Sequence, residues 1–246
     1  MKMNHRLQLK HRKIWAVIPA AGSGSRFSKT ELKQYQRLQQ KTVLEHTVER
    51  LNQLPLAGYV LAISAQDQLA PSLNLAHREL AHFCIGGDER VHSVLNALKY
   101  LESIADPDDW VMVHDAARPC VSLENLENLV QTAINESCSA ILAIPVRDTL
   151  KMVAAHQQIE KTVSREHLWQ AQTPQISTLQ QLKGAIEHAL QHHLQITDEA
   201  SALEFADISV KVVAGRSDNI KITYPEDLLL ADLILTSQQN YNNSVR

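Results

Sequence analysis

The sequence has few cysteines and no long hydrophobic run. Its three cysteines, Cys84, Cys120 and Cys138, are odd in number and widely spaced, so neither a disulfide framework nor a zinc-site spacing is present. This usage is typical of a reducing compartment, and we expect the protein to be cytoplasmic. No apolar stretch reaches the length of a bilayer span, which argues against a membrane protein.

A strong excess of either charge is also missing. The formal net charge is −3, with 24 basic and 27 acidic residues, so the composition favours no nucleic-acid partner. The hydrophobic fraction of 44% and the charged fraction of 21% are ordinary for a globular protein and exclude disorder as the main state. Any anionic ligand must therefore be bound by local cations and backbone N–H groups.

The two ends of the chain read differently from its centre. Residues 1–13 are basic and precede an apolar segment, as in a secretory signal. That segment has only eight residues, contains Pro19 and opens into a glycine-rich turn, so a signal peptide is disfavoured. We expect residues 1–12 to be a flexible leader, residues 13–238 to form a single domain, and Gln238 to Arg246 to be a polar tail.

Short apolar runs alternate with longer amphipathic segments. Such an alternation predicts an α/β fold with a doubly wound, mostly parallel sheet, which binds ligands beyond the carboxyl ends of its strands. The expected strands are Ile14–Ile18, Tyr59–Ser64, His82–Ile85, Trp110–Val113, Ala140–Pro145 and Ile208–Val213. The expected helices are Thr42–Gln53, Asp88–Glu102, Leu123–Asn135, Ser177–His192, Asp198–Phe205 and Pro225–Thr236. Capping signatures open the first and the last of these helices, at Thr42-x-x-Glu45 and Thr223-x-x-Glu226.

Residues 147–169 break this rhythm. They alternate weakly around a polar middle, and we interpret them as a two-stranded β-arm that projects from the domain. An isolated hairpin is marginally stable in water, so the arm needs a surface to pack on. A second subunit is the obvious candidate, which predicts a homodimer formed through the arm.

The first motif with chemical content is the loop Pro19-Ala20-Ala21-Gly22-Ser23-Gly24-Ser25-Arg26. Small residues allow backbone N–H groups to surround phosphates, and Arg26 adds a bidentate cation; Lys33 follows. The loop lacks the third glycine of the dinucleotide fingerprint and the Gly-Lys-Ser/Thr of a P-loop, so an oxidoreductase or a P-loop ATPase is disfavoured. An ordinary tight turn remains the alternative.

Two further motifs follow predicted strands. Gly86-Gly87-Asp88-Glu89-Arg90 permits close backbone approach at a helix start, although a plain strand-to-helix loop would also account for it. Asp115, in Val113-His114-Asp115-Ala116-Ala117-Arg118-Pro119, ends a buried strand and needs a partner. Mg²⁺ carrying nucleotide phosphates is one candidate, and an ion pair with Arg118 is the other.

The last two motifs open the C-terminal helices. In Thr197-Asp198-Glu199-Ala200-Ser201, two acids complement the helix dipole, which is a structural role. In the segment from Asp218 to Asp227, Lys221 can reach a phosphate and Asp218 could join Asp115 on a metal. Helix capping alone would explain Thr223 and Glu226.

Taken together, in this order and at these spacings, the motifs resemble those of the 2-C-methyl-D-erythritol 4-phosphate cytidylyltransferase family, from about Ile14 to Leu235. Lys-Gln-Tyr at 33–35, Pro-Val-Arg-Asp-Thr at 145–149 and Thr-Pro-Gln at 173–175 belong to the same pattern. The resemblance implies a Rossmann-like domain and a CTP-dependent transfer of CMP to 2-C-methyl-D-erythritol 4-phosphate with release of pyrophosphate. It also implies a homodimer in which each arm serves the neighbouring active site.

The resemblance also implies roles for individual residues. It assigns catalysis to Arg26, Lys33, Arg165 and Lys221, and Mg²⁺ binding to Asp115. The expected CTP-binding residues are Ala20, Ala21, Gly22, Ser23, Gly87, Asp88, Ser93 and Ala116. The expected residues for the phosphorylated polyol are Arg118, Thr149, Arg165, Lys221 and Thr223.

Two departures from the family pattern stand beside the glycine-rich loop. Phe27 replaces the usual Met, and Leu32 replaces the usual Pro before the lysine, a change that we expect to loosen the Lys33 segment. Two other functions stay open: a cytidylyltransferase acting on a pentitol phosphate such as ribitol 5-phosphate, and a catalytically silent nucleotide-binding module.

Overall fold

The computed structural model describes residues 12–22, 27–28 and 32–244, with the side chains of the last helix described to Tyr241. A seven-stranded sheet runs through the molecule in the order β11-β7-β10-β6-β1-β4-β5. The strands are β1 (Ile14–Pro19), β4 (Gly58–Ile63), β5 (Ala81–Ile85), β6 (Trp110–Val113), β7 (Ser139–Pro145), β10 (Trp169–Thr178) and β11 (Val210–Ala214). All neighbours pair in parallel except β10, which is antiparallel to β6 and β7. The predicted mostly parallel α/β sheet is confirmed.

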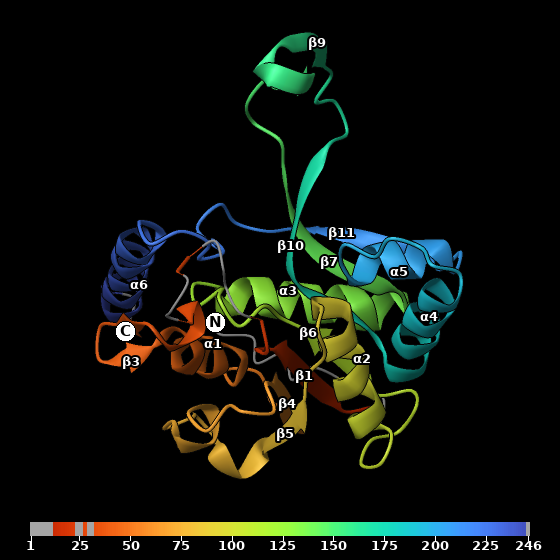
Figure 1. Cartoon of the computed structure of the whole chain (residues 1–246). Helices are drawn as coiled ribbons and strands as arrows, with labels where there is room; N and C mark the ends of the chain where they lie inside the picture. The colour runs from red at the N-terminus through yellow and green to blue at the C-terminus, as the bar shows by residue number, and fades with distance from the viewer. Residues whose placement is uncertain (1–11, 23–26, 29–31, 245–246) are drawn as a thin grey trace.

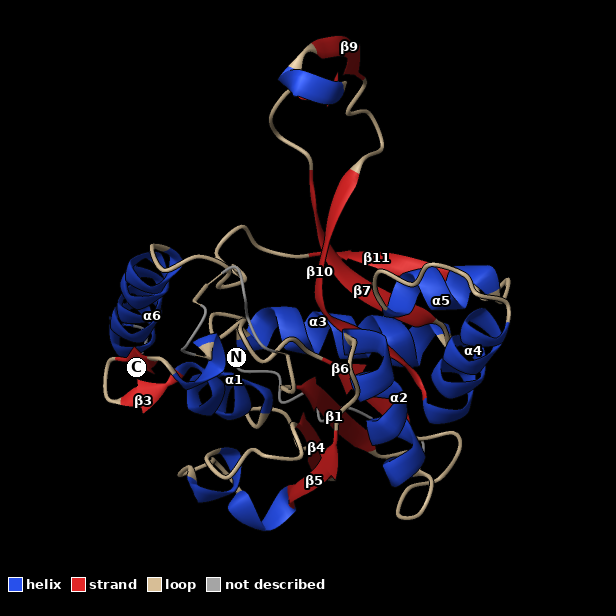
Figure 2. Cartoon of the chain, viewed as in Figure 1, coloured by secondary structure: helices blue, strands red, loops and turns tan. Residues whose placement is uncertain are grey.

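Helices cover both faces of this sheet (Figures 1 and 2). One face packs on α1 (Val43–Leu51) and α3 (Leu123–Glu136), through Leu44, Leu51, Leu126 and Leu129 among others. The opposite face packs on α2 (Arg90–Leu101), α4 (Leu179–Gln191) and α5 (Glu199–Phe205). Successive strand residues point to opposite faces, so Ile14, Ala16 and Ile18 of β1 join the first core and Trp15 and Val17 the second.

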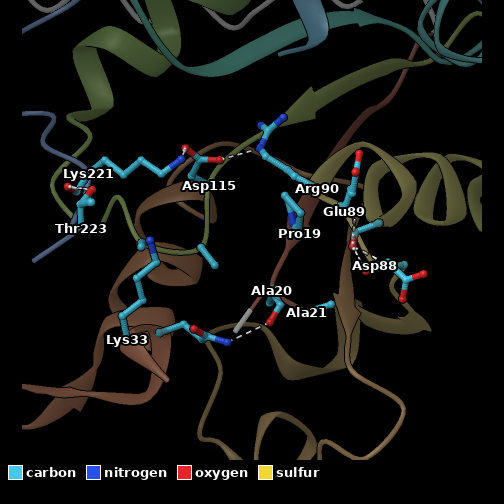
Figure 3. Close-up of a pocket in the computed structure, with 16 residues that line it drawn as sticks. Pro19, Ala20, Ala21, Lys33, Asp88, Glu89, Arg90, Asp115, Lys221 and Thr223 are labelled. Carbon is cyan, nitrogen blue, oxygen red and sulfur yellow. Dashed lines mark hydrogen bonds and ion pairs between the residues drawn. The ribbon is translucent and has the colours of Figure 1, made fainter. Parts of the chain in front are cut away.

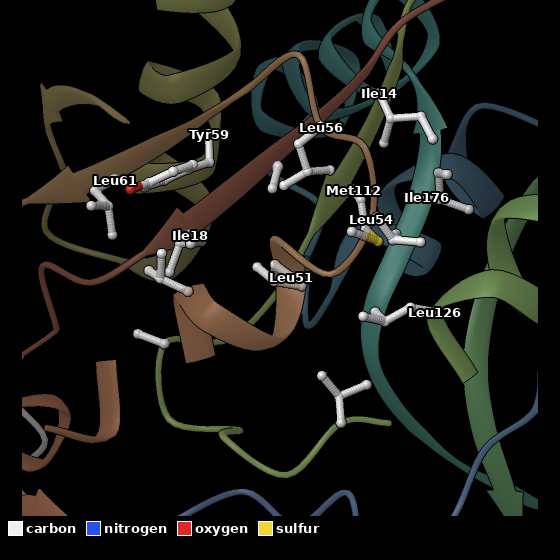
Figure 4. Packing of buried hydrophobic residues seen from close by; sticks show 14 of the residues in the cluster. Ile14, Ile18, Leu51, Leu54, Leu56, Tyr59, Leu61, Met112, Leu126 and Ile176 are labelled. Carbon is white, nitrogen blue, oxygen red and sulfur yellow. The ribbon is translucent and has the colours of Figure 1, made fainter. Parts of the chain in front are cut away.

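The first core is continuous from the sheet to its helices. In Figure 4, Ile14, Ile18 and Met112 of the central strands lie against Leu51 and Leu126 of the covering helices. A smaller cluster seats α6 (Asp227–Ser244), whose Ala231 and Leu235 are fully buried beside Cys120. Tight burial of these side chains from residues 14 to 235 fixes the strand ends, and therefore the loops that follow them, in space.

Strand β10 is the largest difference between the structure and the elements predicted from the sequence. Ser177 and Thr178, assigned from the sequence to the start of a helix, are the last residues of this strand, and Thr178 caps α4. The strand is polar and contains Pro174, features that argue against a central strand. A register shift between Ala171 and Gln175 accommodates the proline, and hydrogen bonds satisfy the buried polar side chains, as between Ser177 and Ser139.

The C-terminal helix differs from its prediction at both ends. Asp227, not Glu226, provides the cap, because its carboxylate accepts hydrogen bonds from the backbone N–H groups of Thr223 and Tyr224 at 2.8 Å. The Thr223 hydroxyl instead donates to the Lys221 carbonyl. The helix also continues beyond its predicted end at Thr236 and through the polar tail to Ser244. At the first helix, the predicted Thr42 and Glu45 capping box is confirmed.

The β-arm projects away from the sheet (Figure 1). Its tip is the antiparallel pair β8 (Leu150–Val153) and β9 (Ile159–Val163), and its base is the extension of β7 and β10. A further short pair, β2 (Arg37–Leu38) and β3 (Lys41–Thr42), precedes α1. The arm carries large exposed apolar side chains, at Met152, Val153, Ile159, Leu168 and Trp169. Among the described residues, no helix combines the length and the apolar character that crossing a membrane requires.

Candidate active site

The main pocket lies where the strand order turns around β1. Strands β4 and β6 lie on opposite sides of β1, and the chain passes from β4 through β5 before it reaches β6. The loops after β1 and β6 therefore diverge and leave a crevice at the carboxyl ends of these strands. A cavity of about 350 Å³ occupies this position. Its lining residues are Pro19, Ala20, Ala21, Gly22, Lys33, Gln34, Gly87, Asp88, Glu89, Arg90, Ser93, Asp115, Ala116, Ala117, Lys221 and Thr223.

This cavity brings together most of the residues predicted from the motifs. The expected nucleotide-binding residues Ala20, Ala21, Gly22, Gly87, Asp88, Ser93 and Ala116 all line it, as do Lys33, Asp115, Lys221 and Thr223. They come from five separate segments of the chain (Figure 3). Ser23 and Arg26 lie outside the described residues.

Lys33 is placed by a short 3-10 helix, Lys33–Tyr35, that is fastened to the glycine-rich loop. The buried Gln34 side chain donates a hydrogen bond to the Ala20 carbonyl at 2.9 Å. The Tyr35 hydroxyl bonds to the Asp67 carboxylate, and burial together with this bond raises the pKa of Tyr35 well above its ordinary range. Lys33 is therefore held in place through its two neighbours, Gln34 and Tyr35. Leu32, which precedes it, has extended backbone.

Asp115 is the electrostatic centre of the pocket. Its Oδ1 accepts from Arg90 Nε at 2.9 Å, and its Oδ2 lies 2.8 Å from Lys221 Nζ and 3.4 Å from Arg118 Nε. Burial alone would raise the pKa of this carboxyl, but Arg90, Lys221 and Arg118 together hold it well below the ordinary value. The predicted Asp115–Arg118 ion pair is present, as one of three.

A buried histidine shapes the turn that carries Asp115. Burial lowers the pKa of His114 to about 4, so the imidazole is neutral at pH 7. Its Nε2 lies 3.0 Å from the Arg118 carbonyl, which can only accept, so this nitrogen bears the proton and donates. Its Nδ1 accepts from the Thr173 hydroxyl at 3.0 Å, and the same hydroxyl accepts from the Asp115 backbone N–H. His114 and Thr173 thereby fix the backbone of the turn.

Several expected residues lie elsewhere. Arg118 contacts Asp115 and the Asn219 carbonyl at 2.7 Å without lining the cavity. Asp218, considered as a second metal ligand, is instead bound by the Arg216 guanidinium through both carboxylate oxygens. Thr149 and Arg165 are exposed on the arm, and no described residue that lines the cavity comes from the arm.

The sequence motifs contained two residues whose role the sequence did not reveal. Arg90 lines the cavity and joins Asp115 to Glu199, with Arg90 Nη1 and Nη2 at 2.6 and 3.0 Å from the two Glu199 oxygens. Glu199 had a local explanation as an acid at a helix start, yet it is only 3% exposed and bound to an arginine 109 positions away. No local signal in the sequence pointed to this role, because Glu204 on the same helix is also acidic and is exposed.

Comparison with known proteins identifies the family. The family model described as IspD, 2-C-methyl-D-erythritol 4-phosphate cytidylyltransferase, matches residues 14–237. The chain belongs to this cytidylyltransferase family. A member from Acinetobacter baumannii strain SDF is 70% identical over 231 residues, which are 94% of this chain and 97% of that protein. A member from Tolumonas auensis is 48% identical over 225 residues, 91% of this chain and 97% of that protein.

Solved structures of cytidylyltransferase family members share the fold. A structure titled as 4-diphosphocytidyl-2C-methyl-D-erythritol synthase has a TM-score of 0.80 and 36% identity, covering 91% of this chain and 99% of its own. The Francisella tularensis cytidylyltransferase has a TM-score of 0.78 and 38% identity, covering 90% and 99%. The family expected from the motifs is therefore confirmed, as is the fold that places those motifs around one cavity.

Proposed function

We propose that this protein transfers the cytidylyl group of CTP to 2-C-methyl-D-erythritol 4-phosphate, giving 4-diphosphocytidyl-2-C-methyl-D-erythritol and pyrophosphate. The observation that carries the proposal is the convergence of Lys33, Asp115 and Lys221 on one cavity, in a chain 70% identical to a relative with that name. A nucleotidyl transfer needs positive charge placed where charge develops on the polyphosphate, and Lys33 and Lys221 line the cavity from separate segments of the chain (Figure 3).

The chemistry requires no general base from the protein. A phosphate monoester has a second pKa of about 6 and is largely dianionic near neutral pH, so its oxygen is already a nucleophile. That oxygen bonds to the α-phosphorus of CTP while the bond from α-phosphorus to the bridging oxygen breaks, and the electron pair leaves with pyrophosphate. The site must align two anions and neutralise the charge of the transition state. Lys33 and Lys221 supply cations for this, together with Arg26 by motif match.

The carboxylate at the end of β6 fits a Mg²⁺ site. Magnesium in nucleotide sites is typically bound by one or two carboxylates plus substrate phosphates. Asp115 lines the cavity, and its low pKa keeps it ionised at all working pH values. No cluster of three metal-ligating side chains occurs in the described part of the chain, so phosphate oxygens and water would complete the coordination. When bound, the ion would supply positive charge to the polyphosphate.

We propose that the arm completes the active site of a second copy. Thr149 and Arg165 are exposed on the arm and do not line their own cavity, although the family pattern contains both. Five large apolar side chains are also exposed on the arm, and a homodimer would cover them. The Cys84, Cys120 and Cys138 thiols are free, as in a reducing compartment, and we place the enzyme in the cytoplasm.

The decisive experiment is release of pyrophosphate from CTP and Mg²⁺, with the erythritol phosphate and ribitol 5-phosphate offered in parallel. We expect release with the erythritol phosphate, and loss of release in Lys33→Ala. Lys99→Ala, at a half-exposed position near the end of α2, is the matched control and should retain activity. Release with ribitol 5-phosphate alone would overturn the substrate and keep the mechanism. Release with neither would leave a silent nucleotide-binding module.

Subunit complementation tests the exchange of arms. We expect Lys33→Ala and Arg165→Ala to be inactive alone, because each fails in a different part of a shared site. After the two variants are mixed and allowed to exchange subunits, half of the active sites in a mixed dimer would contain both native residues. Recovered pyrophosphate release would support the exchange. No recovery, or a purely monomeric profile in gel filtration at several concentrations, would refute it.

A further inference from the structure

Glu199 is a buried carboxylate that lies outside the main cavity but is bound to a residue that lines it. Its side chain is 4% exposed, and both of its oxygens accept from Arg90, at 2.6 and 3.0 Å. Arg90 in turn donates through Nε to Asp115 Oδ1 at 2.9 Å. The chain of contacts Glu199–Arg90–Asp115 therefore runs from a buried helix start to the carboxylate at the centre of the cavity.

The position of Glu199 is fixed from two directions. It is the first residue of α5, where Asp198 and Ser201 form a capping box. The buried Gln175 side chain of β10 binds the same turn, because its amide donates to Asp198 at 2.9 Å and its carbonyl accepts from the Ala200 N–H at 2.8 Å. The backbone on both sides of Glu199 is therefore attached to the central sheet, and the Glu199 side chain extends from this fixed turn to Arg90.

Arg90 is bound by two carboxylates, Glu199 and Asp115, through different nitrogens. The two terminal nitrogens of Arg90 form a bidentate pair with Glu199, which leaves only Nε for Asp115. A guanidinium is a rigid fork that prefers bidentate pairing with a carboxylate. If Glu199 lost its charge, the fork of Arg90 would be free to pair with both oxygens of Asp115, in competition with a metal ion.

Glu199 also contributes to the net charge of the cluster of ionised side chains around Asp115. The cluster holds three cations, Arg90, Arg118 and Lys221, against the two carboxylates Asp115 and Glu199. Neutralising Glu199 adds one positive charge to the site. That change favours a metal-free polyphosphate and disfavours a divalent cation, so the two ligands respond in opposite directions.

We infer that Glu199 is a positioning residue of the cytidylyl transfer: by holding the fork of Arg90, it limits Arg90 to a single bond with Asp115, so that the metal ion that accompanies the nucleotide competes with one bond from Arg90 rather than with a bidentate pair. The inference rests on the proposed function, because it concerns the same cavity and its metal–nucleotide complex. Glu199 itself touches neither ligand, and it acts through Arg90.

The test is calorimetric titration of the full-length protein with CTP, once in Mg²⁺ and once in EDTA. In Glu199→Gln we expect the dissociation constant of Mg²⁺-CTP to rise by about tenfold or more, the range for residues that orient a metal ligand. Metal-free CTP should bind as tightly as to the wild type, or more tightly. Glu204→Gln is the matched control, since Glu204 lies on the same helix and is exposed, and both of its constants should be unchanged.

If Glu199 had only a structural role, Glu199→Gln would weaken the binding of Mg²⁺-CTP and of metal-free CTP in parallel. That result would overturn the inference. Glu199→Asp retains the charge with a shorter reach, so it should lose less Mg²⁺-CTP affinity than Glu199→Gln. If Glu199→Gln cannot be purified folded, Glu199→Asp decides: unchanged affinity for Mg²⁺-CTP would also overturn the inference. These titrations contain no acceptor. A wild type that binds Mg²⁺-CTP but does not act on the erythritol phosphate would refute the proposed substrate and leave this inference standing.

Discussion

Asp115→Asn should destabilise the protein as well as inactivate it. Many active-site residues cost stability because like charges crowd together, and their removal stabilises the fold. Asp115 is the opposite case, because its oxygens meet Arg90 at 2.9 Å, Lys221 at 2.8 Å and Arg118 at 3.4 Å. An asparagine fills the same volume but leaves Lys221 and Arg118 without the carboxylate that compensates them, and leaves Arg90 with Glu199 alone.

The magnitude follows from the burial of the ion pairs. The Asp115 side chain is 9% exposed, so water can replace little of the lost interaction. Breaking a buried ion pair by removing one partner costs about 3–5 kcal/mol. For a chain of this length, each kcal/mol lowers the melting temperature by about 2–4 °C, so a fall of about 6–20 °C is expected in calorimetry or circular dichroism. Asp108→Asn is the control, since Asp108 is 69% exposed and its pair with Arg12 contributes little.

The pH dependence provides an independent check. The pKa of Asp115 is lowered in the folded state, so its contribution is fully present above the unfolded value of about 3.9 and is lost as pH falls below it. The difference between wild type and variant should therefore stay constant from about pH 8 to pH 5 and shrink only in stronger acid. A melting temperature within about 2 °C of the wild type, or a difference that already shrinks above pH 5, would refute the reasoning.

Two further predictions concern the backbone around the cavity. Gly86→Ala should weaken CTP binding by about tenfold, because an added Cβ would lie 2.5 Å from the Ala21 Cβ and displace the glycine-rich loop; calorimetric titration with unchanged affinity would contradict this. His114 has a folded pKa of about 4 against an unfolded value of about 6.5, so its contribution is present above pH 6.5 and declines toward pH 4, by at most about 3 kcal/mol. In His114→Gln, urea unfolding should show a shallower decline over this range, and an unchanged slope would exclude His114 as its source.

The sequence predicted the parts of the fold whose signal is local. Continuous apolar runs predicted β1, β4, β6 and β7, because a strand buried on both faces needs no polar side chain. The edge strands β5 and β11 were also predicted, although they are less buried. Strand β10 was not predicted, since Gln172, Thr173 and Gln175 are polar and buried. Their partners, such as His114 for Thr173 and Asp198 for Gln175, are 59 and 23 positions away in the sequence. Hydrogen bonds over such separations cannot be deduced from periodicity.

The residues of the candidate site also divide into those with a local signal in the sequence and those whose role depends on distant partners. Segments with a glycine-rich loop or an acid at a strand end were predicted from their local chemistry, and the fold places Lys33, Asp115 and Lys221 on one cavity. The roles of Arg90 and Glu199 required the tertiary structure, because each has an adequate local explanation at a helix start. Two residues that were expected to act with the cavity, Thr149 and Arg165, are exposed on the arm and do not line it, and they stay predictions that rest on the proposed exchange of arms.

The ion pairs of Asp115 also explain how a cavity that binds a polyanion stays stable when no polyanion is bound. Arg90, Arg118 and Lys221 would repel one another in an empty cavity, and Asp115 offsets that repulsion until a substrate arrives. A bound polyphosphate can take over part of this role, since it presents several oxygens to Arg90 and Lys221, which line the cavity. Inorganic pyrophosphate should therefore raise the melting temperature of Asp115→Asn more than that of the wild type, provided that Mg²⁺ is absent. An equal or smaller increase in the variant would show that Arg90 and Lys221, the two of these cations that line the cavity, do not face the polyphosphate, and would place its binding elsewhere in the cavity.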